Sequence, residues 1–177
     1  MLRRYNIPSE RGEGWAVIVI DTEVGFFATV SDWGNFAYQW TAPGREFRLF
    51  LIGLTPDYLH GKLLYGRGRD SINVFDGEKT VATIREAIVS RDTASLKKSK
   101  RNWRWYNAEM DAVEQRTPMA QEDFDAWCSE TRLEEPWQYR QTQPEPQAMA
   151  FCMKVWPRFK LLLEAELLKD GFDVHAT

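Results

Sequence analysis

The chain has 177 residues, a net charge of −3 and 44% hydrophobic residues, which suits one domain with a sizeable core. The negative net charge argues against a protein that binds nucleic acid through its overall charge. No apolar run approaches the ~20 residues that span a bilayer. Cys128 and Cys152 lie far apart without metal-ligand neighbours, so neither a disulfide framework nor a thiolate metal site is predicted. We expect a soluble, intracellular protein without cofactor or metal.

Residues 15–40 predict three short antiparallel strands, because Val, Ile, Phe and Thr dominate the runs and turn-forming residues separate them. The first turn is expected at residues 22–25, with Gly25 at positive φ. The second is expected at residues 33–35, with Gly34 and Asn35 in strained backbone. The first strand is apolar on both faces, so it should be central and covered on both sides or by a partner. No strand is predicted for the polar residues 1–13.

Helices are predicted for most of the remaining chain. Apolar spacing favours helices over 45–54 and from 56, then from 76, over 93–114, from 118 and over 147–169. The helix from 56 is expected to begin with Thr55 as its N-cap and Pro56 at its first position. The order of strands first and helices after predicts an α+β fold, with an N-terminal antiparallel meander packed with helices and a mostly helical C-terminal half. A single domain is expected over 1–177, with its sheet-containing part at about 12–66 and its helical part at about 76–171.

Asp21 and Glu23 close an apolar run in a pattern that resembles the first motif of the DEDD exonucleases. In that family such carboxylates hold two divalent ions for phosphodiester hydrolysis. Asp76 loosely matches the second motif, but Tyr106 and Asp111 have the wrong spacing for the third. A metal-dependent nuclease is therefore the lesser alternative, and the two acids are interpreted as solvated groups beside a turn. No complete catalytic set is found, which favours a non-catalytic protein.

A basic segment at residues 97–106 interleaves cations with aromatic rings and contains no acid. Phosphates suit the cations and base faces suit the rings, so this segment predicts a nucleic-acid-binding module. The alternative is a solvated helix face. The residues concerned are Lys97, Lys98, Lys100, Arg101, Trp103, Arg104 and Trp105.

An acidic segment follows at residues 109–135, with nine acids against two bases. Glu122, Asp123 and Asp125 at its centre would dock on a basic groove of a partner by imitating phosphate charge. A solvated helix exterior, or pairing with the basic segment, is the alternative.

The chain has eight tryptophans, more than a small core usually needs. An aromatic contact surface is therefore predicted, with Trp33 and Trp40 as anchors near the hairpin. The alternative is that the rings fill the core.

Residues 12–65 carry a pattern that resembles a family of proteins encoded by bacteriophages and prophages. The pattern consists of Gly14-Trp15-Ala16, the run from Ser31 to Trp40, Phe47-Arg48-Leu49-Phe50-Leu51 and the run from Tyr58 to Leu63. The resemblance implies a non-structural accessory protein made in the cytoplasm of the bacterial host. Inhibitors of host defence, including anti-CRISPR proteins, recur among such proteins. The leading hypothesis is thus a non-catalytic protein that binds a bacterial host protein or nucleoprotein, with direct nucleic-acid binding as the alternative.

Overall fold

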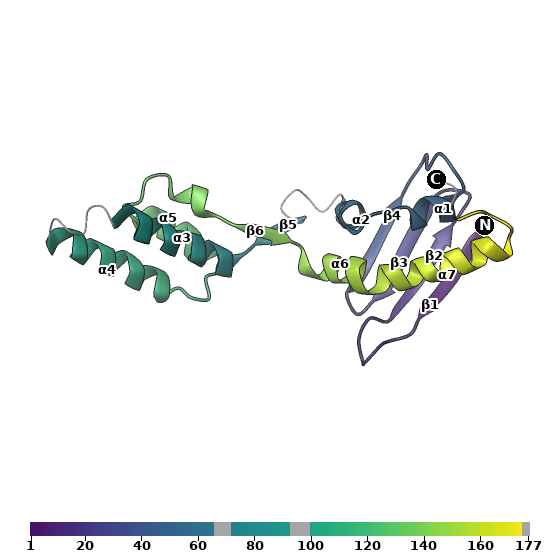
Figure 1. Cartoon of the computed structure of the whole chain (residues 1–177), viewed down its shortest axis with the longest axis horizontal. Coiled ribbons are helices and arrows are strands. Elements are labelled where there is room, and N and C mark those ends of the chain that lie inside the picture. Colours follow the sequence, from purple (N-terminus) through teal and green to yellow (C-terminus); the bar gives the residue numbers. More distant parts are fainter. Residues whose placement is uncertain (66–71, 93–99, 175–177) are drawn as a thin grey trace. The chain divides into compact units, whose positions relative to one another are not determined.

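A computed structural model of the protein describes residues 1–65, 72–92 and 100–174. The chain forms two compact units (Figure 1). Unit 1 comprises Met1–Ile72 and Pro144–Thr177, and unit 2 comprises Asn73–Gln143. Unit 2 is therefore inserted between two parts of unit 1. The single domain expected over 1–177 stays a prediction, because two contact units can still unfold together.

Unit 1 is built on an antiparallel meander with the strand order β1-β2-β3-β4. The strands are β1 (Leu2–Ile7), β2 (Ala16–Asp21), β3 (Phe26–Ser31) and β4 (Gly34–Gln39). The α+β class, with an antiparallel sheet followed by helices, is confirmed. Strand β2 is interior, as predicted. The sequence predicts no strand at β1, because only Tyr5 and Ile7 of that segment face the core and the rest is polar or exposed.

The strand register corrects one of the two predicted turns. Asp21 pairs with Phe26, so residues 22–25 form the first turn, and Gly25 has the expected positive φ of 65°. Ser31 pairs with Gly34, so the second turn lies at residues 32–33 and not at 33–35. Gly34 does have a positive φ of 116°, but it begins β4.

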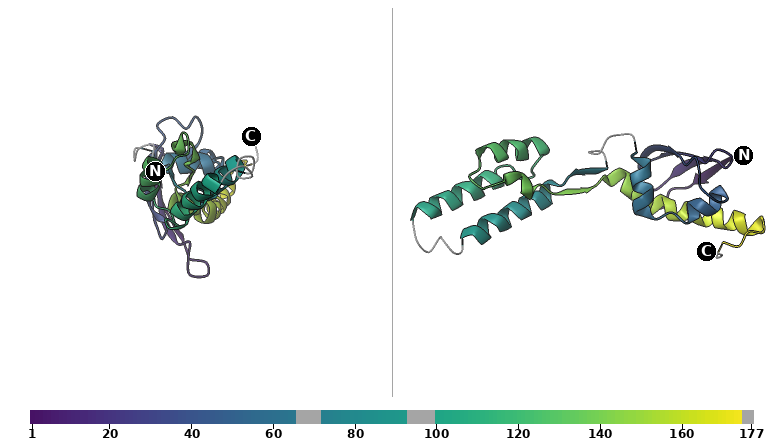
Figure 2. Two further views of the ribbon diagram at one scale, coloured as in Figure 1. Left: turned by 90° about the vertical axis from the view of Figure 1, so that its left-hand side faces the viewer. Right: turned by 90° about the horizontal axis from the view of Figure 1, so that it is seen from above.

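Helices of unit 1 pack on one face of this sheet (Figures 1 and 2). They are α1 (Phe47–Ile52), α2 (Pro56–Leu63), α6 (Pro146–Ala150), a π-helical turn (Phe151–Val155) and α7 (Trp156–Lys169). Thr55 caps α2 by accepting a hydrogen bond from the Tyr58 amide, with Pro56 in the first turn, as the sequence predicts. Among the described residues no helix combines the length and apolar character that crossing a bilayer requires.

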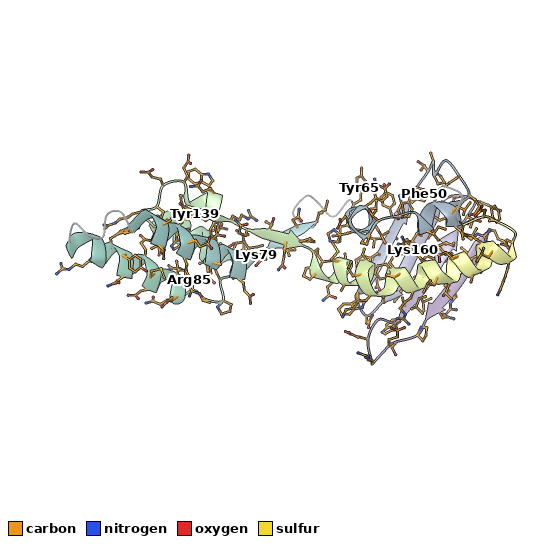
Figure 3. The ribbon with its side chains drawn as sticks, viewed as in Figure 1. Phe50, Tyr65, Lys79, Arg85, Tyr139 and Lys160 are labelled. Atoms are coloured by element: carbon orange, nitrogen blue, oxygen red, sulfur yellow. The ribbon has the colours of Figure 1, made fainter. Side chains whose placement is uncertain are left out.

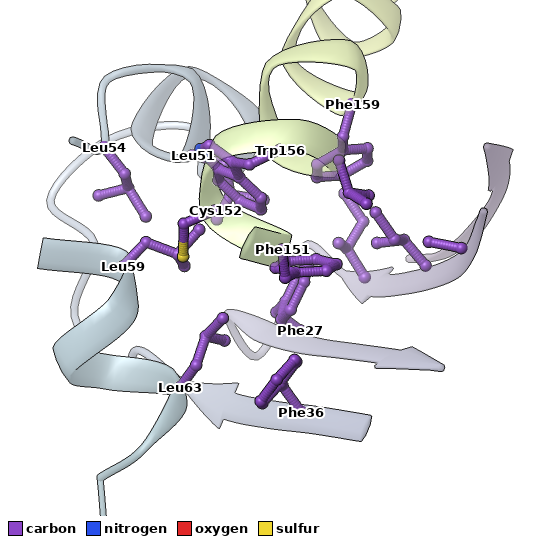
Figure 4. Close-up of a cluster of buried hydrophobic side chains, with 14 of the residues drawn as sticks. Phe27, Phe36, Leu51, Leu54, Leu59, Leu63, Phe151, Cys152, Trp156 and Phe159 are labelled. Carbon is purple, nitrogen blue, oxygen red and sulfur yellow. The ribbon is translucent and has the colours of Figure 1, made fainter. Parts of the chain in front are cut away.

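The core of unit 1 is a set of aromatic and aliphatic side chains between sheet and helices (Figure 4). Phe27 lies at its centre, with ring centroids 5.6 Å from Trp156 and 6.4 Å from Phe151. Edge-to-face contacts of this kind add to the free energy of burying apolar area. The predicted C-terminal helix thus forms the main cover of the sheet.

Unit 2 is mostly helical and has its own core. Its elements are β5 (Asn73–Phe75), α3 (Gly77–Asp92), α4 (Lys100–Glu114), α5 (Gln121–Glu130) and a 3₁₀ turn (Pro136–Tyr139), and β5 pairs with β6 (Thr142–Pro144) (Figure 2). Ile84, Ile88, Val113, Phe124 and Trp127 are fully or almost fully buried in it. On the surface, Arg85 of α3 lies 3.8 Å from the Glu114 carboxylate of α4 (Figure 3).

Candidate functional site

Asp21 and Glu23 have partners within unit 1. The Asp21 carboxylate accepts hydrogen bonds from the Met1 ammonium group (2.9 Å) and from the Glu23 amide (3.1 Å), and these bonds lower its pKa. The Glu23 carboxylate lies 3.1 Å from the same ammonium group. Asp76, in unit 2, caps the start of α3 by accepting from the Lys79 amide. Within residues 1–65, 72–92 and 100–174, no cluster of three or more His, Cys, Asp or Glu suits a metal ion.

The two predicted aromatic anchors pack into unit 1. Trp40 is buried, and its indole Nε1 donates to the Tyr58 hydroxyl at 3.3 Å. Trp33 is half-buried, with the Lys154 ammonium 4.5 Å from its ring centre. Both rings therefore stabilise the fold, and their role in partner binding stays a prediction.

The three predicted acidic residues lie on α5. Asp123 accepts a hydrogen bond from the Ala120 amide, which helps begin the helix. Asp125 accepts from the Gln121 side chain at 3.0 Å, and Glu122 is exposed. Elsewhere in the acidic segment, Glu130 is bound by Arg116 at 2.5 Å. Part of the negative charge is thus neutralised within unit 2, and phosphate mimicry stays a prediction.

The basic segment is described only in part. Lys97 and Lys98 lie outside the described residues, and only the helical backbone of α4 is described for Lys100, Arg101 and Trp103. Arg104 and Trp105 line a pocket of about 580 Å³ in unit 2, which we call the α4–α5 pocket. Its other lining residues are Ala108, Glu109, Ala112, Trp127, Glu130, Thr131 and Arg132.

Glu109 is the buried carboxylate of the α4–α5 pocket. It accepts hydrogen bonds from the Thr131 hydroxyl (2.8 Å) and the Arg132 amide (3.2 Å), so it ties α4 to the chain that follows α5. The sequence gives no sign of this, because Glu109 and Arg132 lie more than twenty residues apart in the acidic segment. Only the fold brings them together beside Arg104 and Trp105.

Helix α7 carries an exposed apolar stripe that periodicity alone did not reveal. Its members recur at spacings of four or three residues, and we call them the outer stripe of α7: Met153, Pro157, Leu161, Ala165, Leu168 and Phe172. Met153 lies in the π-helical turn before α7, and Phe172 lies beyond the end of α7. Leu161 is 65% exposed and Leu168 is 58% exposed. The opposite side of the helix is buried in the core through Trp156, Phe159 and Leu163. A helix that is apolar on two sides is usually covered on both.

The outer face of the sheet is a second apolar surface. Cross-strand partners place Val17 beside Val30, and Val19 beside Ala28, on the face away from the helices. Most of these side chains are half-buried by their neighbours, although Val30 is exposed. The apolar character that was predicted for both faces of β2 is therefore present, with less exposed area than the outer stripe of α7.

Comparison with known proteins gives one finding about origin. Residues 2–164 match a family model described as a phage family, and the match spans residues of both units. No curated protein and no solved structure matches the chain significantly.

Proposed function

The chain belongs to a phage protein family, and we propose that it acts by binding a bacterial host protein through the outer stripe of α7. The observation that carries this proposal is a helix with one apolar side in the core and exposed apolar side chains on a second side. Such a surface costs solubility unless something covers it, and exposed patches of this kind commonly mark interaction sites.

The stripe has the composition of an interface centre. Each leucine that a partner buries fully would contribute roughly 1.5–3 kcal/mol, which helps offset the loss of freedom on association. Lys154 and Arg158 lie next to stripe residues in the sequence and are held in ion pairs with Glu13 (2.9 Å) and Glu10 (3.0 Å). An apolar centre with a charged rim is the usual anatomy of a protein–protein interface.

Within this role, the narrower proposal is inhibition of host defence in the host cytoplasm, of which anti-CRISPR activity is one form. It is supported only by the phage origin of the family. The stripe itself favours protein as the partner, because it carries no charge that would attract nucleic acid.

The proposal is tested with Leu161→Glu/Leu168→Glu, which places charge in the centre of the stripe. Val24→Glu is the matched control, because Val24 is 50% exposed but lies in the first turn of the sheet. Proteins captured from host lysate are quantified by mass spectrometry, and the leading one is purified and titrated against each variant.

We expect wild type and Val24→Glu to bind this protein equally, and the double variant to bind it at least tenfold more weakly. Thermal melts of all three should agree, since the changed side chains are exposed. Equal binding by all three proteins would contradict the proposal. It would also fail if wild type were a dimer by light scattering and the double variant a monomer, because the stripe would then serve self-association.

A further inference from the structure

The α4–α5 pocket presents two cations that have no acid to pair with. Among the described residues, neither the Arg104 nor the Arg132 guanidinium forms an ion pair or a hydrogen bond. By contrast, Glu130 is already neutralised by Arg116, and the buried Glu109 is held by Thr131 and the Arg132 amide. The two arginines are therefore available to bind an anion. A guanidinium group can bind a phosphate through two parallel hydrogen bonds.

A buried donor without an acceptor lies at the same pocket. Trp127 lines the pocket and is only 1% exposed, yet its indole N–H has no partner among the described atoms. Buried donors are nearly always satisfied, so an unpaired one calls for an explanation. The nitrogen itself has almost no accessible area, so an acceptor atom of a ligand would reach it only if the Trp127 ring turned towards the pocket.

Two further lining residues suit a nucleobase: Trp105 could stack on its face, and Glu109 could accept a hydrogen bond from its edge. Trp105 is half-buried and offers a flat aromatic surface. Stacking of a base on such a ring is worth about 1–3 kcal/mol. Glu109 uses each carboxylate oxygen once, and a carboxylate can accept about four hydrogen bonds, so it retains capacity for an amino group on a base.

We propose that the α4–α5 pocket binds a nucleotide, with the base against Trp105 and the phosphate between Arg104 and Arg132. The volume of about 580 Å³ lies within the range of small-molecule sites, roughly 300–1,000 Å³. A free nucleotide and one residue of a single strand present the same groups. This site is independent of the outer stripe of α7.

The test uses the full chain and two probes: a fluorescein-labelled 12-nucleotide single-stranded DNA and an equimolar mixture of ribonucleoside monophosphates. The variants are Arg132→Gln and Trp105→Ala. Arg140→Gln is the matched control, because Arg140 is an exposed arginine of unit 2 that does not line the pocket. Affinities are measured by anisotropy and calorimetry between 50 and 200 mM salt, with a poly-glutamate peptide as competitor.

We expect Arg132→Gln and Trp105→Ala each to weaken binding at least tenfold, and Arg140→Gln to change it less than twofold. Loss of the Arg132 contact should also reduce the slope of log affinity against log salt by about 0.7 for the strand. Tighter binding of the strand than of the monophosphates would identify a strand-binding site, and equal binding would identify a free-nucleotide site. No binding at 50 mM salt, equal weakening by Arg140→Gln, or equal displacement by poly-glutamate would overturn the proposal.

Discussion

Arg48 is a buried cation that joins α1 to the end of α7. Its guanidinium donates to Glu46 (2.8 Å) and Asp170 (2.7 Å) and lies 3.6 Å from Glu166. Replacing Arg48 by Met would leave Glu46 without this cation, and Glu166 and Asp170 with Arg3 alone, at 3.1 Å and 3.9 Å. Because they are partly exposed, we expect a loss of about 2 kcal/mol in unfolding free energy, less than the 3–5 kcal/mol typical of fully buried pairs. Urea denaturation checks this, and Arg45→Met, at an exposed position, should change stability by under about 0.5 kcal/mol.

Asp170 makes the same cluster sensitive to acid. The hydrogen bond from Arg48 lowers the pKa of Asp170 below its ordinary value. The folded pKa is thus lower than the unfolded one, so the stabilisation is complete above the unfolded pKa and is lost as the pH falls through the folded pKa. We expect wild type to exceed Asp170→Asn in stability at pH 7 and to lose that advantage progressively as the pH falls below the ordinary carboxyl pKa of about 4. Denaturant titrations across this range measure the difference, and a constant gap would contradict the expectation.

Gly25 is required for both its backbone conformation and its lack of a side chain. It has a φ of 65°, and a Cβ there would collide with the Trp40 carbonyl oxygen. Gly44 has a similar φ of 75° with open space around it. Both Gly→Ala changes strain the backbone by about 1 kcal/mol, but only Gly25→Ala adds a collision with backbone. Thermal melts should therefore show Gly25→Ala clearly less stable than Gly44→Ala, and equal melts would show that the turn relaxes freely.

At the scale of elements, the sequence predicted those features that depend on residues close together in the chain. The N-cap at Thr55, the interior strand β2 and the helix ending near Lys169 follow from residues close in sequence. Strand β1 escaped prediction because its pairing with β2 depends on a partner across the loop, and its own residues are mostly polar. The α4–α5 pocket escaped for the same reason, since Arg104 and Arg132 meet only through tertiary packing.

Two acids of α5, Glu122 and Asp125, can be reversed in charge without removing the hydrogen bond that begins the helix. Asp123 accepts from the Ala120 amide at the helix start, so Asp123→Lys would cost stability of about 1 kcal/mol as well as charge. Glu122→Lys/Asp125→Lys changes charge by four units and leaves that bond intact. If these acids dock on a basic partner, the association rate with that partner at low salt should fall at least tenfold in stopped-flow measurements. The melting temperature should fall only slightly, because Asp125 loses the bond from Gln121 and Glu122 leaves the first turn, but both side chains are exposed. An unchanged rate would remove phosphate mimicry as a mechanism.

At the scale of the whole molecule, the single domain over 1–177 stays a prediction, and the buried hydrophobic side chains form two separate clusters. Overall hydrophobic content could not reveal this, because residues from Pro144 onward return to unit 1 after a long insertion. The buried clusters follow the same division, one built around Phe27 and Trp156 and the other around Ile84 and Phe124.

One mutation in each core tests whether the two units unfold independently. Ile84 and Leu163 are each fully buried, one in each core, and each change to Ala should cost about 2–5 kcal/mol. If the units unfold independently, Ile84→Ala will speed amide hydrogen exchange in unit 2 and leave the strands of unit 1 as protected as in wild type, and Leu163→Ala will do the reverse. Hydrogen exchange followed by mass spectrometry resolves both units in one experiment. Equal loss of protection in both units from either change would instead establish a single cooperative domain, because the free energy of each core would then be shared by the whole chain.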